Sequence, residues 1–335
     1  MKKLLTRLLL LGITVLLPLS FYNYSTDFYG VFKGDLSRKY NEPNFRFIKT
    51  KFVLDHSDKY DSYIFGSSRV GKIIAYKYSP SAYNMYYSEG IPSEFLEDIK
   101  LLIQKGVTIK NIYIGLDEFS FKIFPQRHQG QLLRLAYHQD WVEDIASYMQ
   151  YLIEPPKIGF PKYEVPTNFD YTKSGAPLHY PVDSAINSNP EAHITSEKFN
   201  KPAKYHGKRV DATIKDIQEI INLCKSEAID LTIFINPAFV NTYTQYSFNE
   251  IAEIKLKLAK ITEYEDFSGF NKITMNPINY YESNHYRYHV GDSIWLHCSG
   301  KQKASFAKHV TENNIQEYLQ KEKAEWIKFT SKPSP

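Results

Sequence analysis

A short apolar run near residue 64 leads directly into a turn of small and hydroxyl-bearing residues. Residues 63–65 (Tyr-Ile-Phe) have the length and composition of a buried strand, and Gly66, Ser67 and Ser68 follow at once. At the carboxyl edge of an α/β sheet, such a turn presents a nucleophile or binds a phosphate. The stretch therefore predicts a strand of a sheet and a candidate site, although small residues after a strand also form ordinary turns.

Short apolar runs alternate with helical segments along much of the chain. Apolar residues recur at helical spacing after Pro92, where Gly106 ends the segment, and again after Asp211. Strands joined by helical crossovers pair in parallel, so the sequence predicts an α/β fold with a parallel sheet of about five strands. The predicted strands are 63–65, 82–86, 111–118, 231–235 and 264–269.

Composition limits the classes of function. The chain has 335 residues, a net charge of +4 and 43% hydrophobic residues, which suits one sizeable core or a core with an inserted lobe. So small a charge does not indicate nucleic-acid binding. The two cysteines, Cys224 and Cys298, show no Cys/His spacing typical of a structural zinc site, although one disulfide is possible. We expect neither a metal nor a cofactor.

The amino terminus has a basic flank followed by an apolar run. Lys2, Lys3 and Arg7 precede residues 8–19, and an extended run over 4–22 approaches the roughly 20 residues that a membrane span needs. No small-residue cleavage site follows. Residues 1–24 are therefore predicted to be an uncleaved signal anchor, a transmembrane helix with a cytoplasmic N-terminus and an extracytoplasmic main domain, periplasmic or at the cell surface. A cleaved signal peptide and a buried amphipathic helix are the alternatives.

The remaining chain divides into three predicted parts. Residues 25–59 form a juxtamembrane stalk that passes into a first helix near 46–58, and residues 60–310 form the α/β domain. Repeated prolines interrupt the pattern over 124–205, which predicts an inserted lobe over the carboxyl edge of the sheet. Residues 311–335 are predicted to form a C-terminal helix and tail.

A second motif lies far along the chain from the Gly-Ser-Ser turn. Glu282 precedes His285 by three residues, a spacing that can place a carboxylate beside an imidazole in a tight turn. Together with Ser68, these residues would supply a nucleophile, a base and a group that orients the base. Glu and His often occur at this spacing by chance, so the motif indicates a catalytic site only in combination with Ser68.

Four short blocks, in this order, resemble those of the SGNH/GDSL hydrolase superfamily: residues 66–68, 84–90, 115–118 and 282–285. The likeness is greatest to its membrane-anchored, exported members, which acylate or deacylate cell-envelope polymers. It covers about 60–295, apart from the insertion. The resemblance implies a three-layer, flavodoxin-like fold.

The resemblance also implies roles for individual residues. Ser68 matches the nucleophile, His285 the base, and Ser68 and Gly90 match residues of the oxyanion hole. Asp117 stands where the family usually has an asparagine of that hole, and an ionised carboxylate cannot donate a hydrogen bond. Glu282 stands where the family has an aspartate, and the first block reads Gly-Ser-Ser in place of Gly-Asp-Ser.

The implied function is that of a membrane-anchored, exported serine esterase or O-acyltransferase. Its substrate would be an acyl group of a cell-envelope glycan or lipid, and its implied partner a membrane-bound O-acyltransferase. One alternative is a catalytically silent scaffold of the same fold that binds a glycan or a membrane acyltransferase. Another is a P-loop nucleotide hydrolase, because residues 66–72 satisfy G-x-x-x-x-G-K, although Ile73 replaces the hydroxyl residue that would hold magnesium.

Overall fold

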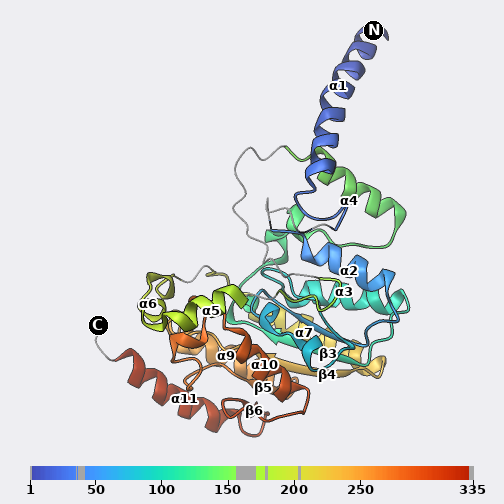
Figure 1. The fold of residues 1–335 in the computed structure, drawn as a ribbon. Coiled ribbons are helices and arrows are strands. Elements are labelled where there is room, and N and C mark those ends of the chain that lie inside the picture. The colour runs from blue at the N-terminus through green and yellow to red at the C-terminus, as the bar shows by residue number, and fades with distance from the viewer. Residues whose placement is uncertain are drawn as a thin grey trace.

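A six-stranded sheet forms the centre of the protein in a computed structural model, which describes residues 2–34, 36, 42–155, 171–177, 180–202 and 205–331 (Figure 1). The strand order is β2-β1-β3-β4-β5-β6, and the first five strands are parallel. The strands are β1 (Ser62–Gly66), β2 (Ala82–Asn84), β3 (Asn111–Leu116), β4 (Asp230–Ile235), β5 (Tyr264–Asp266) and β6 (Lys308–Val310). The predicted α/β fold with a mostly parallel sheet is confirmed, and the order of the first five strands is the flavodoxin-like one.

Strand β6 pairs antiparallel with β5 and was not predicted. It has only three residues, and Lys308 and His309 are exposed. Such a strand has no apolar run by which a sequence could reveal it.

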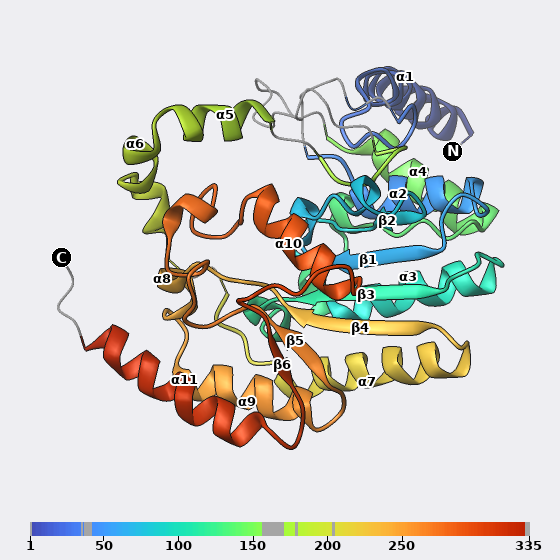
Figure 2. The ribbon, with the colours of Figure 1, turned by 60° about the horizontal axis from the view of Figure 1, so that its bottom comes forward.

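Helices cover both faces of the sheet (Figure 2). Tyr113 of β3 pairs with Ile64, the neighbour of Phe65 in β1, so Phe65 and Tyr113 point to opposite faces. Phe65 packs on Phe95 of α3 with ring centroids 5.9 Å apart, whereas Tyr113 packs on Trp295 of α10 at 4.8 Å. The domain is therefore a three-layer arrangement, and burial on both faces explains the apolar character of the central strands.

Several helices begin where the sequence provides a cap or a proline. Asn44 accepts a hydrogen bond from the Phe47 amide at the start of α2, and Pro92 occupies the first turn of α3. The main helices are α1 (Lys2–Thr26), α2 (Phe45–Asp55), α3 (Pro92–Gln104), α4 (Trp141–Ile153), α5 (Tyr180–Ser188), α6 (Pro190–Ile194), α7 (Val210–Ser226), α8 (Val240–Tyr243), α9 (Phe248–Ala259), α10 (Tyr288–Cys298) and α11 (Ile315–Thr330).

The N-terminal segment forms helix α1, but the predicted transmembrane helix is not found. No helix among the described residues is both long enough and apolar enough to cross a membrane. Arg7 precedes the apolar run in the sequence, and Asn23, which follows the run, is buried at the junction with α4. There the Asn23 side chain donates hydrogen bonds to the Leu152 and Glu154 carbonyl oxygens at 2.9 and 2.8 Å. The end of α1 is therefore part of the folded domain.

The segment predicted as an insertion contains α4, α5 and α6. Residues 156–170, 178–179 and 203–204 of this segment lie outside the described residues, as do 1, 35, 37–41 and 332–335 elsewhere. Cys224 is buried in the core, and it and Cys298 are free thiols.

Candidate active site

The turn after β1 is held by side chains on its inner side. A Cβ atom on Gly66 would lie 2.3 Å from Val70 Cγ2, so only glycine fits here. The Ser67 hydroxyl donates to Asp117 Oδ2 at 2.6 Å, and the Arg69 amide donates to Ser67 Oγ at 3.2 Å. Ser68, between them, faces a cavity.

The loop before α10 is shaped by Glu282. Its carboxylate accepts hydrogen bonds from the His285 amide at 2.9 Å and from the Asn284 amide at 3.1 Å. Tyr280 and Tyr286 form an antiparallel bridge that closes the loop. A local interaction between a side chain and the backbone therefore fixes His285, as the spacing of the two residues allows.

The fold brings Ser68, His285 and Glu282 into one hydrogen-bonded row. Ser68 Oγ lies 2.8 Å from His285 Nε2, and His285 Nδ1 contacts Glu282 Oε1. The serine and the histidine are 217 positions apart in the chain. The extra methylene of Glu282, relative to aspartate, does not prevent the contact.

The charges of the row suit a base. Burial lowers the pKa of His285, although the Glu282 carboxylate opposes the shift. Burial raises the pKa of Glu282, but hydrogen bonds from His285 and the Asn284 amide lower it overall, to about 2. At neutral pH the carboxylate is therefore ionised and the imidazole is neutral, able to accept a proton from a hydroxyl group.

Arg69 is a buried hub of hydrogen bonds. Its side chain is only 2% exposed. The guanidinium group donates two hydrogen bonds to Glu118 at 2.7 Å and one to Asp117 at 3.0 Å. Its Nε donates to the Asn284 carbonyl oxygen at 2.8 Å. Arg69 thus connects the turn after β1, the end of β3 and the loop of His285.

Asp117 is part of this hub and not an oxyanion donor. Its carboxylate accepts hydrogen bonds from Ser67 and Arg69, and burial raises its pKa to about 6. It is therefore mostly ionised at neutral pH and cannot donate a hydrogen bond, so its predicted place in the oxyanion hole has no support here. Among the described residues, the backbone amide of Ser68 has no hydrogen-bond acceptor, which leaves it free to serve an oxyanion.

Gly90, the other predicted donor, lies under the same edge of the sheet. Its amide donates to the Tyr87 carbonyl oxygen at 3.3 Å, a long hydrogen bond. A Cβ atom at this position would lie 2.8 Å from the Phe95 ring and 2.9 Å from the Gly66 carbonyl oxygen. The glycine is therefore required by close packing beneath the nucleophile turn.

We expect Gly90→Ala to destabilise the protein by about 1–3 kcal/mol, because the added methyl group has to displace a ring or a backbone carbonyl. Urea unfolding measures the change. Gly12→Ala is the matched control, since nothing lies within 4 Å of a Cβ atom there. Equal stability of the two variants would contradict the close packing.

A cavity of about 510 Å³ opens beside Ser68 and His285. Its wall is mainly polar and aromatic. Part of the wall comes from the segment predicted as an insertion, in which the sequence analysis identified no site residue. The other lining residues are Glu42, Arg69, Ser88, Glu89, Glu118, Phe119, Arg127, Gln131, Leu133, Arg134, Pro202, Tyr205, Thr242, Tyr246 and Asn284.

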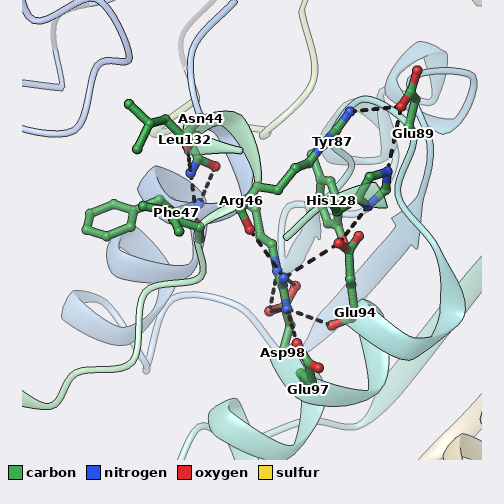
Figure 3. Close-up of polar contacts among 12 residues, drawn as sticks. Asn44, Arg46, Phe47, Tyr87, Glu89, Glu94, Glu97, Asp98, His128 and Leu132 are labelled. Atoms are coloured by element: carbon green, nitrogen blue, oxygen red, sulfur yellow. Dashed lines mark hydrogen bonds and ion pairs between the residues drawn. The ribbon is translucent and has the colours of Figure 1, made fainter. Parts of the chain in front are cut away.

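A network of buried charges holds the cavity edge at residues 88–90 (Figure 3). Glu89 has a φ of 57°, in the left-handed region that side chains rarely adopt. Its carboxylate contacts the Tyr205 hydroxyl and lies 3.5 Å from Arg134 Nη2 and 3.6 Å from His128 Nε2. His128 Nδ1 contacts Glu94 of α3 at 2.7 Å. His128, Arg134 and Tyr205 thus position one wall of the site.

The glycine-rich stretch that ends in Lys72 does not form a phosphate cradle with its last amides. The Lys72 and Ile73 amides donate to the Arg69 and Val70 carbonyl oxygens at 3.0 and 2.9 Å. Lys72 Nζ lies 5.3 Å from the centroid of the Tyr281 ring, and burial lowers its pKa to about 8. Among the described residues, no group of three or more His, Cys, Asp or Glu side chains is placed to hold a metal ion.

Comparison of the sequence with models of known protein families finds no match, and comparison with curated proteins finds none either.

Proposed function

We propose that the protein is a serine esterase or O-acyltransferase of SGNH type that acts on acyl groups of a cell-envelope glycan or lipid. The observation that carries this proposal is the row from Ser68 Oγ through His285 to Glu282, with 2.8 Å between the hydroxyl oxygen and the imidazole nitrogen. A nucleophile, a base and an orienting carboxylate in this order are the requirements for acyl transfer through a covalent intermediate.

The proposed reaction has two steps. Ser68 Oγ attacks the acyl carbonyl carbon while its proton moves to His285 Nε2, and Glu282 holds the opposite ring nitrogen. The oxyanion that forms receives a hydrogen bond from the Ser68 amide. The carrier oxygen then leaves with the proton from His285, and the acyl group stays on Ser68. Water or a second hydroxyl group, deprotonated by His285, then attacks the acyl-enzyme. The bond between the acyl carbon and Ser68 Oγ breaks, His285 returns the proton to Ser68 Oγ, and the free acid or the new ester leaves.

The cavity supports a short acyl group on a polar carrier. Its wall includes the carboxylates of Glu42 and Glu89 and the guanidinium groups of Arg127 and Arg134. A long acyl chain there would remove these charges from water without offering them hydrogen bonds, which is costly. A hydroxylated carrier such as a glycan could satisfy them. Export from the cytoplasm and a membrane-bound acyltransferase as partner belong to the same proposal, and only the sequence motifs support them.

A silent, binding-only protein is the second candidate. It is favoured by the small number of oxyanion donors, since Asp117 is an acceptor and the Gly90 amide is bonded to Tyr87. Loss of one donor typically costs on the order of 10² to 10³ in rate. The two candidates make opposite predictions for the reactivity of Ser68.

A fluorophosphonate probe tests the proposal, because it reacts with a serine that has an adjacent base. We expect stoichiometric labelling of the purified protein, with the probe found on the peptide that contains Ser68 and lost in Ser68→Ala. Ser88→Ala is the control, since Ser88 also lines the cavity but contacts Glu42 and not a histidine. No labelling, or labelling that survives Ser68→Ala, would favour the silent protein.

The pH dependence of ester cleavage is expected to follow His285. The imidazole acts as a base only when neutral, and burial lowers its pKa below the ordinary value of about 6.5. Activity should therefore rise with pH, and its acid midpoint should lie below about 6.5. In Glu282→Gln the carboxylate that raises the histidine pKa is lost, so the midpoint should move to still lower pH while the maximal rate falls. A midpoint above 7 in the unaltered protein would contradict this assignment of the base.

A further inference from the structure

Large apolar side chains that are exposed gather on two helices, α1 and α4, in the part of the chain that the structure describes. On α4 they include Trp141, of which 76% is exposed, and four aliphatic residues that follow it along the helix. These four residues are Val142, Ile145, Met149 and Ile153.

The outer face of α4, defined by these five residues, is a continuous apolar stripe. At about 100° per residue, they fall within an arc of roughly 120° around the helix axis. Other residues of the helix pack on the domain: Phe32 stacks on Tyr148 with ring centroids 5.7 Å apart, and the Tyr151 hydroxyl donates to the Leu132 carbonyl oxygen at 2.9 Å. A surface helix normally exposes a polar face. The outer face of α4 therefore needs a partner that is apolar.

The base of helix α1 lies beside α4, and the rest of α1 extends away from the domain (Figure 1). The hydrogen bonds from Asn23 to the Leu152 and Glu154 carbonyl oxygens join its base to the end of α4. Along α1, exposed apolar residues point in several directions around the axis, among them Val15, Leu17 and Phe21. These exposed residues add to the apolar surface that α4 presents.

Charge and aromatic residues favour lipid as the partner. Arg7 is exposed toward the free end of α1, where a cation would meet anionic headgroups. Exposed aromatic residues lie near the junction of α1 with the domain, at Tyr22 and Tyr24, and on α4, at Trp141. Tyrosine and tryptophan are the residues that prefer the interface between lipid and water.

We propose that the outer face of α4 lies on the surface of a lipid bilayer, with Trp141 in the interfacial region and α1 beside it. This contact would hold the domain at a membrane through two adjacent helices. It does not depend on the proposed enzymatic activity.

Tryptophan fluorescence offers a direct test, because the chain has three tryptophans and the other two are internal. Trp295 is 2% and Trp326 8% exposed, against 76% for Trp141. With the full chain and vesicles of phosphatidylcholine and phosphatidylglycerol, we expect a blue shift of the emission. Lipids brominated on the acyl chain should quench it, and Trp141→Phe should abolish both effects.

Two matched variants test the face itself. Ile145→Glu with Met149→Glu should weaken vesicle binding, measured by co-sedimentation, by about tenfold or more, because each substitution replaces an exposed apolar side chain that would contact lipid with a charged one. Ile327→Glu makes the same kind of change on α11, where the isoleucine is 57% exposed, and should leave binding unchanged. Circular dichroism confirms that the variants are folded.

Three results would overturn the proposal. One is emission that does not respond to vesicles, and another is an equal loss of binding in Ile327→Glu. The third is a dimer in sedimentation without lipid that Ile145→Glu abolishes, because a second copy would then cover the face.

Discussion

His285→Gln is expected to lower the rate of ester cleavage by at least about 10³-fold, measured with a soluble acetyl ester, if the proposed function is correct. Glutamine cannot accept the proton of Ser68, whose oxygen lies 2.8 Å from the imidazole. The hydroxyl group would then have to react without a base. Reaction with the fluorophosphonate probe should slow in parallel, because it uses the same base.

His289→Gln is the matched control for this experiment. His289 follows in the first turn of α10, contacts Asn279 at 3.0 Å and does not line the cavity. Its substitution should change the rate by less than about threefold, within the small effects usual for a site outside the chemistry. The double variant Ser68→Ala with His285→Gln should be little slower than either single variant, because residues that act as one unit are not additive. Equal rates for His285→Gln and His289→Gln would remove His285 from the mechanism.

Arg69→Met is expected to cost about 3–5 kcal/mol of folding free energy, measured by urea unfolding, because it leaves buried carboxylates without their partner. Asp117 and Glu118 are 1% and 6% exposed, and both accept hydrogen bonds from the guanidinium group. Activity should also fall in any molecules that remain folded, since the Asn284 carbonyl oxygen next to His285 loses its donor.

Lys110→Met provides the comparison for Arg69. Lys110 also pairs with an acid, Asp61, at 3.0 Å, but its side chain is 68% exposed. An exposed pair typically contributes only about 0–1 kcal/mol, so this variant should be nearly as stable as the unaltered protein. Arg69→Lys keeps the charge but not the paired hydrogen bonds, and should fall between the two. If Arg69→Met were as stable as Lys110→Met, the hub would not hold the site together.

The sheet could be predicted because its central strands are buried on both faces and so appear as apolar runs. Gly66 follows the run at residues 63–65, and both the position of this strand and its parallel pairing agree with the structure. Helix α10 was not predicted, since tyrosine, histidine, glycine and aspartate in its first turns give no clear helical repeat. It forms because Trp295 packs on Tyr113, a contact between distant parts of the chain.

The candidate site was predictable only in part. Ser68, Glu282 and His285 can be selected because each lies in a short motif with a chemical meaning. Arg69 could have been recognised from the two acids that end the neighbouring strand, since the carboxyl ends of parallel strands meet at one edge of a sheet. The left-handed backbone at Glu89 and its contacts with Arg134 and His128 leave no pattern in the sequence.

Local chemistry was enough to define the strand before Ser68 and the spacing that lets Glu282 hold the His285 amide, because both depend on residues within a few positions of one another. Only the tertiary structure decided three features: the distance from Ser68 to His285, the burial of Arg69, and the part of the cavity wall near Arg134. These features depend on strand order and on packing across more than a hundred positions, and neither leaves a periodic trace in a single sequence.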